Sequence, residues 1–115
     1  MMVCSSGFTI KRKQRVGARK MTSLEFRNSL KSDVPPAALP PLLQALWWDA
    51  KDNWSRAHEI AQDIESRDAA WVHAYLHRKE GDASNAGYWY SQAGRPSSKI
   101  EVEAEWLELV DHLLD

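Results

Sequence analysis

Two histidines, His73 and His77, have the clearest capacity for chemistry in this chain of 115 residues. They lie four positions apart, so on a helix they share one face and can bind one metal ion together. Three further residues carry suitable ligand atoms: His58, Glu80 and Asp82. The zinc-protease pattern is absent, because alanine and not glutamate follows His73. The preferred interpretation is that both histidines pack in or beside the core, with their ring nitrogens satisfied by hydrogen bonds, so no metal site is expected and metal binding by His73 and His77 is the alternative.

A second group of polar and aromatic residues surrounds the turn that follows these histidines. Its members are His77, Arg78, Glu80, Tyr88 and Tyr90. Histidine suits acid–base work because its pKa lies near neutrality, so the group could bind a small anion or act as an acid–base pair. Arg78 and Lys79 are equally typical of the solvated end of a helix, where the helix dipole favours cations.

Motifs for covalent catalysis and phosphate binding are missing. No serine lies in a Gly-x-Ser-x-Gly elbow, and the five glycines form no phosphate cradle. The single cysteine, Cys4, lies in a segment that we do not expect to fold. We therefore assign no catalytic residue and expect no cofactor.

Charge is distributed unevenly along the chain. Residues 1–20 contain six basic side chains and no acidic one, whereas the remainder has nine basic and sixteen acidic. We expect residues 1–21 to be a disordered basic leader, a piece of a transit peptide, or upstream sequence with Met21 as the natural first residue. The third reading is preferred, because Thr22 to Glu25 forms a capping box. An acidic body repels a phosphate backbone, so nucleic acid is not an expected partner.

Composition and periodicity predict a single all-α domain over residues 22–115. Hydrophobic residues make up 43% and charged residues 27%, as in globular proteins, and no apolar run approaches the roughly 20 residues of a membrane span. A soluble, cytoplasmic protein with no membrane partner is expected. Helical spacing predicts helices over residues 22–30, 41–51, 54–65, 69–80 and 83–93, and a last one opened by a capping box at Ser98 to Glu101. Asp68 is the expected N-cap of the central helix.

The chain repeats itself with an offset of 29 residues. Ala45 falls on Ala74, Ala57 falls on Ala86, and the turn Asp52-Asn53 falls on Gly81-Asp82. Each copy reads as a helix, a tight polar turn and a second helix with a small residue at the close approach. The offset predicts two stacked helical hairpins, preceded by a short helix and closed by a C-terminal capping helix.

The second copy resembles the tetratricopeptide family and its Sel1-like relatives. The matching positions are the turn glycine, the two small residues and the large aromatic: Gly81, Ala86, Ala93 and Tyr90. The resemblance covers Pro41 to Pro96. It departs from the family at Ala74, where glycine is usual, and at His73 and His77, where leucine and tyrosine are usual. The repeat is also shorter than the usual ~34 residues. Residues 70–82 are further similar to a group of small bacterial proteins.

The resemblance implies a peptide-binding groove lined by the first helix of each repeat. From the second copy, that groove would present Asp68, Trp71, Tyr75, Arg78 and Lys79; Leu42, Leu46 and Asp49 would line it from the first. The alternative is that Trp71 and Tyr75 belong to the core, because aromatic side chains at helical spacing pack inward. Trp48 follows Trp47, so it points about 100° around the helix. It either contacts a neighbouring element or is an exposed anchor for a partner.

The preferred hypothesis is therefore a non-enzymatic helical repeat module that binds a protein or peptide. The alternative is a small-molecule or metal-binding protein, or an enzyme, that uses His73, His77 and Glu80. The sequence leaves the oligomeric state open.

Overall fold

The computed structural model describes residues 21–115, so the expected basic leader lies outside the described residues except for Met21. Within this range the chain forms six α-helices, one short 3-10 helix and no strand. In chain order these are α1 (Ser23–Asn28), η1 (Ser29–Lys31), α2 (Pro41–Ala50), α3 (Trp54–Gln62), α4 (Arg67–Lys79), α5 (Ala83–Ala93) and α6 (Val102–Leu114). The predicted all-α class is confirmed. No helix within residues 21–115 is both long and apolar enough to cross a lipid bilayer.

The helix starts follow local capping chemistry, with two corrections to the prediction. The capping box at Thr22 and Glu25 is present, with each side chain bonded to the other's backbone N–H. Asp68 is not the N-cap of α4. The hydroxyl of Ser66 accepts the bond that closes the first turn, and Asp68 lies inside that turn, where a carboxylate is also favourable.

The predicted capping box at Ser98 is also wrong. Helix α6 begins at Val102, and its N-cap residue Glu101 makes no side-chain capping bond. The guanidinium of Arg78 donates to the carbonyl of Ile100, which holds the connection between α5 and α6 against α4. The chain therefore remains non-helical past Ser98.

The turns between α2 and α3 and between α4 and α5 have the same backbone geometry. The amide of Asn53 donates to the carbonyl of Trp48, and the amide of Asp82 donates to that of His77, each at 2.9 Å. Both turns also contain a residue with positive φ, 63° at Asp52 and 92° at Gly81. Glycine adopts this conformation without a steric cost, and aspartate tolerates it better than most residues. Corresponding bonds in the two turns are 29 residues apart, as the sequence offset predicts.

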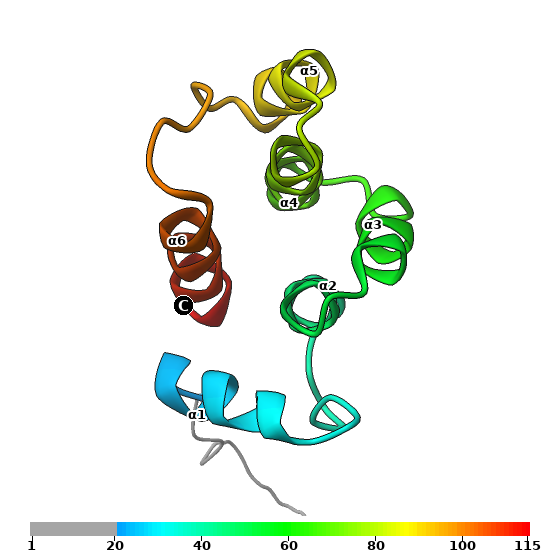
Figure 1. Ribbon diagram of the computed structural model, residues 1–115, viewed down its shortest axis with the longest axis vertical. Coiled ribbons are helices and arrows are strands. Elements are labelled where there is room, and N and C mark those ends of the chain that lie inside the picture. Colours follow the sequence, from blue (N-terminus) through cyan, green and yellow to red (C-terminus); the bar gives the residue numbers. More distant parts are fainter. Residues whose placement is uncertain (1–20) are drawn as a thin grey trace, which may run out of the picture.

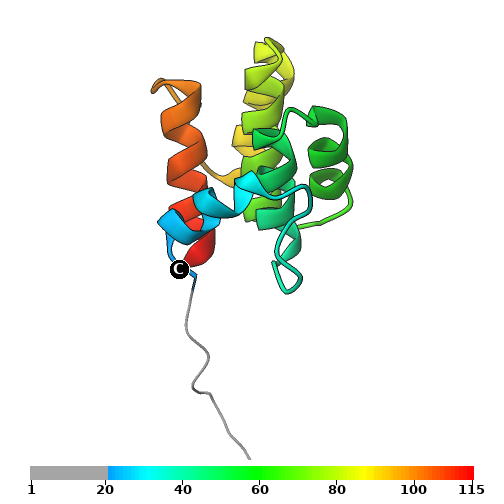
Figure 2. The same cartoon turned by 60° about the horizontal axis from the view of Figure 1, so that its bottom comes forward.

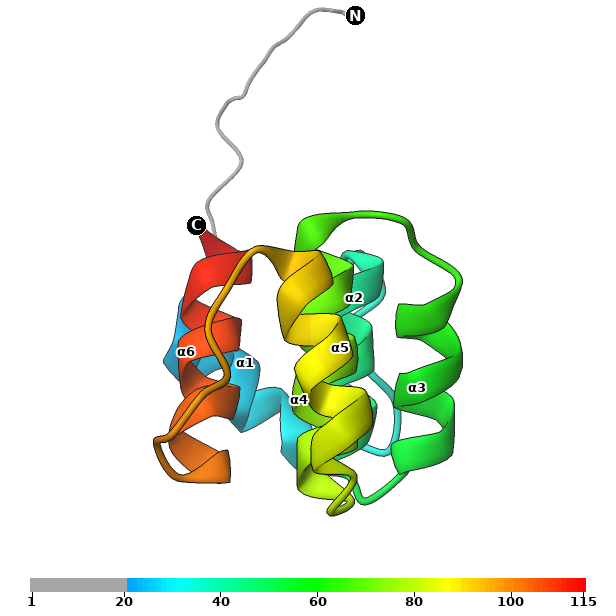
Figure 3. The same ribbon diagram turned by 90° about the horizontal axis from the view of Figure 1, so that it is seen from above.

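Helix α4 is the centre of the molecule, as its apolar sequence predicted. Every residue from Ala69 to His77 is buried. Helices α2, α3, α5 and α6 all pack against α4, and Figure 1 shows them arranged around it. Figure 3 shows α3 and α6 on opposite sides of α4 and α5. One central helix can therefore bring its residues to several partners.

Helix α6 packs against α2 and α4, which are the first helices of the pairs α2–α3 and α4–α5. Trp106, Leu109 and Val110 are buried on it, and the Trp106 indole N–H donates to the carbonyl of Leu46 at 3.0 Å. Leu107 lies next to Trp106 in the sequence but is 37% exposed. The buried stripe follows spacings of three and four residues from Trp106, so Leu109 belongs to it and Leu107 does not.

Helix α1 crosses the end of α6 near the start of the described chain, as Figure 2 shows. Phe26 is fully buried with its ring 5.8 Å from that of Trp106. The indole N–H of Trp47 donates to the hydroxyl of Ser29, and the ammonium of Lys51 donates to the carbonyl of Leu30. These bonds fix the first segment to α2.

A candidate metal centre between α3 and α4

Three histidines meet where α3 faces α4. His58 comes from α3, and His73 and His77 come from successive turns of α4. One ring nitrogen from each lies within 4.8 Å of the others. The Nε2 atoms of His58 and His73 are hydrogen-bonded at 2.9 Å, and the rings of His73 and His77 stack with centroids 4.8 Å apart. The structure therefore brings the predicted pair together with His58, one of the three candidate third ligands.

Two indole rings enclose this histidine cluster. Trp54 stacks on His58 at 4.8 Å between centroids, and its N–H donates to the carbonyl of Leu76 at 2.8 Å. Trp89 stacks on His73 at 4.0 Å. His73 and His77 are buried, whereas His58 is half-buried. The aromatic walls therefore hold the imidazoles in place and leave solvent access on the His58 side.

Burial keeps two of the imidazoles neutral. Desolvation by burial, with smaller contributions from the neighbouring His58 and His77, lowers the pKa of His73 to about 4. Desolvation also lowers the pKa of His58, with a contribution from His77. Both rings therefore carry no charge at pH 7. A neutral imidazole has a free lone pair, which is the form that binds a metal ion.

A carboxylate orients the third ring. The Nδ1 atom of His77 lies 2.7 Å from a carboxylate oxygen of Glu80. A carboxylate accepts the proton of Nδ1, so the lone pair of His77 is placed on Nε2. Metal-binding histidines in proteins commonly have such a partner, which fixes the tautomer and makes the ring a stronger ligand. His77, Glu80 and Asp82 form a second cluster of potential ligands, but the Asp82 carboxylate already caps α5.

The two aromatic residues predicted for the peptide groove are part of the core. Trp71 is 3% exposed and Tyr75 is 2% exposed. The Trp71 N–H donates to Glu105 at 3.1 Å, and the Tyr75 hydroxyl donates to Asp49 at 2.7 Å. The core interpretation of these two residues is thus confirmed, and a peptide on this face would have to displace α6.

The charged residues predicted for the groove bind partners inside the protein. Lys79 donates to the buried Asp49 at 2.9 Å, and Arg78 donates to the buried Glu105 at 2.7 Å. Asp68 pairs with His112 at 2.9 Å near the surface. Trp48 is half-buried and packs against the core, with the Arg56 guanidinium of α3 lying 4.7 Å from its ring. Of the two predicted alternatives for Trp48, the contact to a neighbouring element is confirmed.

Glu105 is the polar residue that the sequence analysis missed. Its carboxylate is fully buried and accepts bonds from Trp71, Arg78 and the hydroxyl of Tyr90, the last at 2.6 Å. The sequence does indicate that Glu105 is buried, because it lies three residues after Val102 and four before Leu109, on the apolar stripe of α6. A lone acidic residue on such a stripe indicates a buried pair.

The group of polar and aromatic residues that we predicted around the turn after α4 divides between two faces of that helix. His77 and Glu80 belong to the histidine cluster, whereas Arg78 and Tyr90 bind Glu105 on another side. Tyr88 is 56% exposed. Consecutive helical residues point about 100° apart, so neighbours in sequence reach different partners.

No protein family model, curated protein or solved structure matches the chain. The resemblance to the tetratricopeptide family therefore stays a prediction.

Proposed function

We propose that this protein binds a divalent transition metal ion through His58, His73 and His77. The observation that carries the proposal is the convergence of three imidazole nitrogens from two helices within 4.8 Å. Two of the rings are neutral because burial lowers their pKa, and Glu80 orients the third. Stacked indoles on His58 and His73 preorganise these two ligands.

Two of the three ligand nitrogens are already close to the spacing that a metal ion needs. Zinc binds imidazole nitrogen at about 2.0–2.1 Å in a tetrahedral site, which places ligand nitrogens roughly 3.3 Å apart. The His58 and His73 nitrogens, now 2.9 Å apart, must separate by a few tenths of an ångström. The proton of their hydrogen bond must also leave the coordinating nitrogen, and the other nitrogen of the same ring can take it.

The ligand set selects among metals. Imidazole suits zinc, copper, nickel and iron, whereas magnesium and calcium prefer oxygen ligands. All three proposed ligands are imidazoles, and Glu80 is already bonded to Nδ1 of His77. Zinc, copper, nickel or iron is therefore the expected class of ion.

The metal would join two helical hairpins. In the proposed tetratricopeptide-like arrangement, α2 with α3 and α4 with α5 are two copies of one unit, supported by the turn bonds that recur after 29 residues. His58 would belong to the first copy and the other two ligands to the second. His73 and His77 occupy positions where the family usually has leucine and tyrosine. This difference from the family would provide two of the metal ligands. Peptide binding by α2 and α4 has less support, because α6 covers Trp71 and Tyr75.

Equilibrium dialysis against Zn²⁺, with metal analysis of the tag-free protein, tests the proposal. We expect one zinc ion per chain and at least a tenfold loss of affinity in His58→Ala. The matched control is His112→Ala, which removes an exposed histidine of α6 outside the cluster and should leave zinc affinity unchanged. Absence of zinc binding, or equal affinity in His58→Ala and the wild type, would overturn the proposal.

A further inference from the structure

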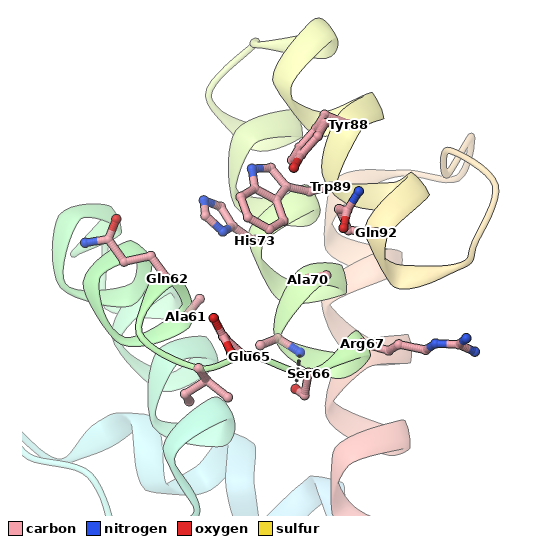
Figure 4. Close-up of a pocket in the computed structure, with 12 residues that line it drawn as sticks. Ala61, Gln62, Glu65, Ser66, Arg67, Ala70, His73, Tyr88, Trp89 and Gln92 are labelled. Carbon is pink, nitrogen blue, oxygen red and sulfur yellow. Dashed lines mark hydrogen bonds between the residues drawn. The ribbon is translucent and has the colours of Figure 1, made fainter.

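A second set of potential metal ligands adjoins the histidine cluster at the turn between α4 and α5. One ligand atom each from His77, Glu80 and Asp82 lies within 4.8 Å of the others, so His77 belongs to both sets. Figure 4 shows Trp89 of α5 beside His73, whereas His77 is one turn further along α4, next to the turn into α5. The Glu80 side chain is 39% exposed, so an ion can reach this second set from solvent.

The two ring nitrogens of His77 can serve the two sets separately. Its Nδ1 atom lies 2.7 Å from a carboxylate oxygen of Glu80, while Nε2 is the nitrogen that would bind the first metal ion. An imidazole ring that gives up its Nδ1 proton has a lone pair on each nitrogen and can bind one metal ion through each. A second ion would therefore take the place of the proton that His77 shares with Glu80.

The capping bond of Asp82 does not exhaust its carboxylate. Asp82 caps α5 with Oδ1, which accepts from the amide of Asn85 at 3.2 Å. In the turn between α2 and α3, Asn53 accepts the corresponding bond from the amide of Arg56, also at 3.2 Å. Asparagine and aspartate are about equally good N-caps, so capping does not require a carboxylate at position 82. Its Oδ2 accepts a long bond, 3.4 Å, from the Asn85 side chain and retains lone pairs for an ion.

This ligand set occurs in only one of the two turns that share a backbone geometry. The residues 29 positions before His77 and Glu80 are Trp48 and Lys51, which offer no metal ligand. Within residues 21–115, no lysine or arginine forms an ion pair with Glu80 or Asp82. Two neighbouring carboxylates without a basic partner attract a divalent cation.

We infer, on the basis of the proposed metal site, that a second divalent transition metal ion binds through Nδ1 of His77 and the carboxylates of Glu80 and Asp82. The His77 ring then bridges the two ions as an imidazolate, and its Nδ1 proton goes to solvent. The second ion binds more weakly than the first, because the two cations repel each other and a proton must be displaced. One zinc ion per chain is therefore bound at low free zinc, and the second binds only at higher concentration.

Electron paramagnetic resonance during titration with Cu²⁺ tests the bridge. Copper is the probe because it binds nitrogen and oxygen ligands most tightly among the divalent ions of the first transition row. Two Cu²⁺ ions that share an imidazolate couple antiferromagnetically and lose their signal at low temperature, whereas an ion bound elsewhere adds to the signal. We expect the signal to rise to one spin per chain with the first equivalent and to fall at least twofold with the second. Equilibrium dialysis measures the bound copper at each point.

The substitution Asp82→Asn separates the second ion from the cap of α5. It removes one ligand but keeps a capping side chain, as Asn53 shows in the other turn. This variant should bind the first copper ion as the wild type does and keep its signal when a second equivalent is added. The control is Asp111→Asn, the same change at an exposed residue of α6, which should behave as the wild type. Far-UV circular dichroism verifies the fold of each variant.

The possible results distinguish this inference from the proposed function. A protein that binds no copper would refute the metal function itself. A single bound copper ion at saturation, a second ion that doubles the signal, or an equal loss of signal in Asp82→Asn and the wild type would overturn this inference alone.

Discussion

Replacing Glu105 with alanine removes the acceptor that joins α6 to α4 and α5. Three donors lose their partner: the Trp71 indole, the Tyr90 hydroxyl and the Arg78 guanidinium. Breaking one partner of a buried ion pair costs about 3–5 kcal/mol, and each stranded neutral donor adds a cost of order 1 kcal/mol. The Arg78 side chain is 22% exposed and can partly rehydrate, which lowers the total. We expect the free energy of unfolding to fall by about 4 kcal/mol.

Urea denaturation followed by tryptophan fluorescence and circular dichroism measures this loss. Glu108→Ala, at an exposed site on the same helix, is the control and should change stability by less than about 0.5 kcal/mol. If α6 detaches before the rest unfolds, the dependence on urea concentration should also become shallower, because less surface is exposed in the main transition. A loss below 1 kcal/mol in Glu105→Ala would refute the role given to the buried carboxylate.

Three further predictions concern the histidine cluster and the turns. Acidifying the metal-free protein from pH 6.5 to pH 4 should lower its free energy of unfolding by about 2–3 kcal/mol, because His73 takes up its proton near pH 6.5 when unfolded but near pH 4 when folded. Urea unfolding of the wild type and of His73→Gln over this pH range isolates the contribution of His73. Parallel pH profiles of the two proteins would contradict the prediction. Free Zn²⁺ at one hundred times its Kd should stabilise the fold by about 2.7 kcal/mol and raise Tm by roughly 10 °C or more, and a chelator should reverse the shift. If one zinc ion is bound per chain but Tm does not change, the site is not confined to the folded state. Gly81→Ala should lower the free energy of unfolding by about 1 kcal/mol, because the φ of Gly81 is 92°. Gly87→Ala should raise it by up to about 1 kcal/mol, because Gly87 lies inside α5 with open space around it. Thermal melts that rank the two variants the other way would contradict the turn geometry.

Local signals predicted most of the helical framework. The capping box of α1 and the limits of α5 depend on residues within one turn of each other, so sequence spacing alone locates them. The burial of α4 follows from apolar residues on nearly every face. The Ser98 prediction failed because the guanidinium of Arg78 holds the carbonyl of Ile100, which is 22 residues away in the sequence. Such a long-range bond has no sign in the local pattern.

The candidate site was only partly predictable for the same reason. The spacing of His73 and His77 places them on one face whatever else the fold does. The choice among His58, Glu80 and Asp82 required the distance between α3 and α4. The stacking of Trp89 on His73 likewise depends on how α5 packs on α4, since the two residues come from different helices. Helix packing, unlike helix formation, is decided by contacts distant in sequence.

X-ray absorption at the zinc edge of the loaded protein tests the three-histidine site most directly. The proposed site predicts only nitrogen and oxygen neighbours of the zinc ion at about 2.0–2.1 Å, with the outer-shell scattering of three imidazole rings. In His58→Ala the imidazole contribution should fall to two rings. An imidazole contribution of one ring or none in the wild type, or an identical spectrum in His58→Ala, would contradict coordination by His58, His73 and His77.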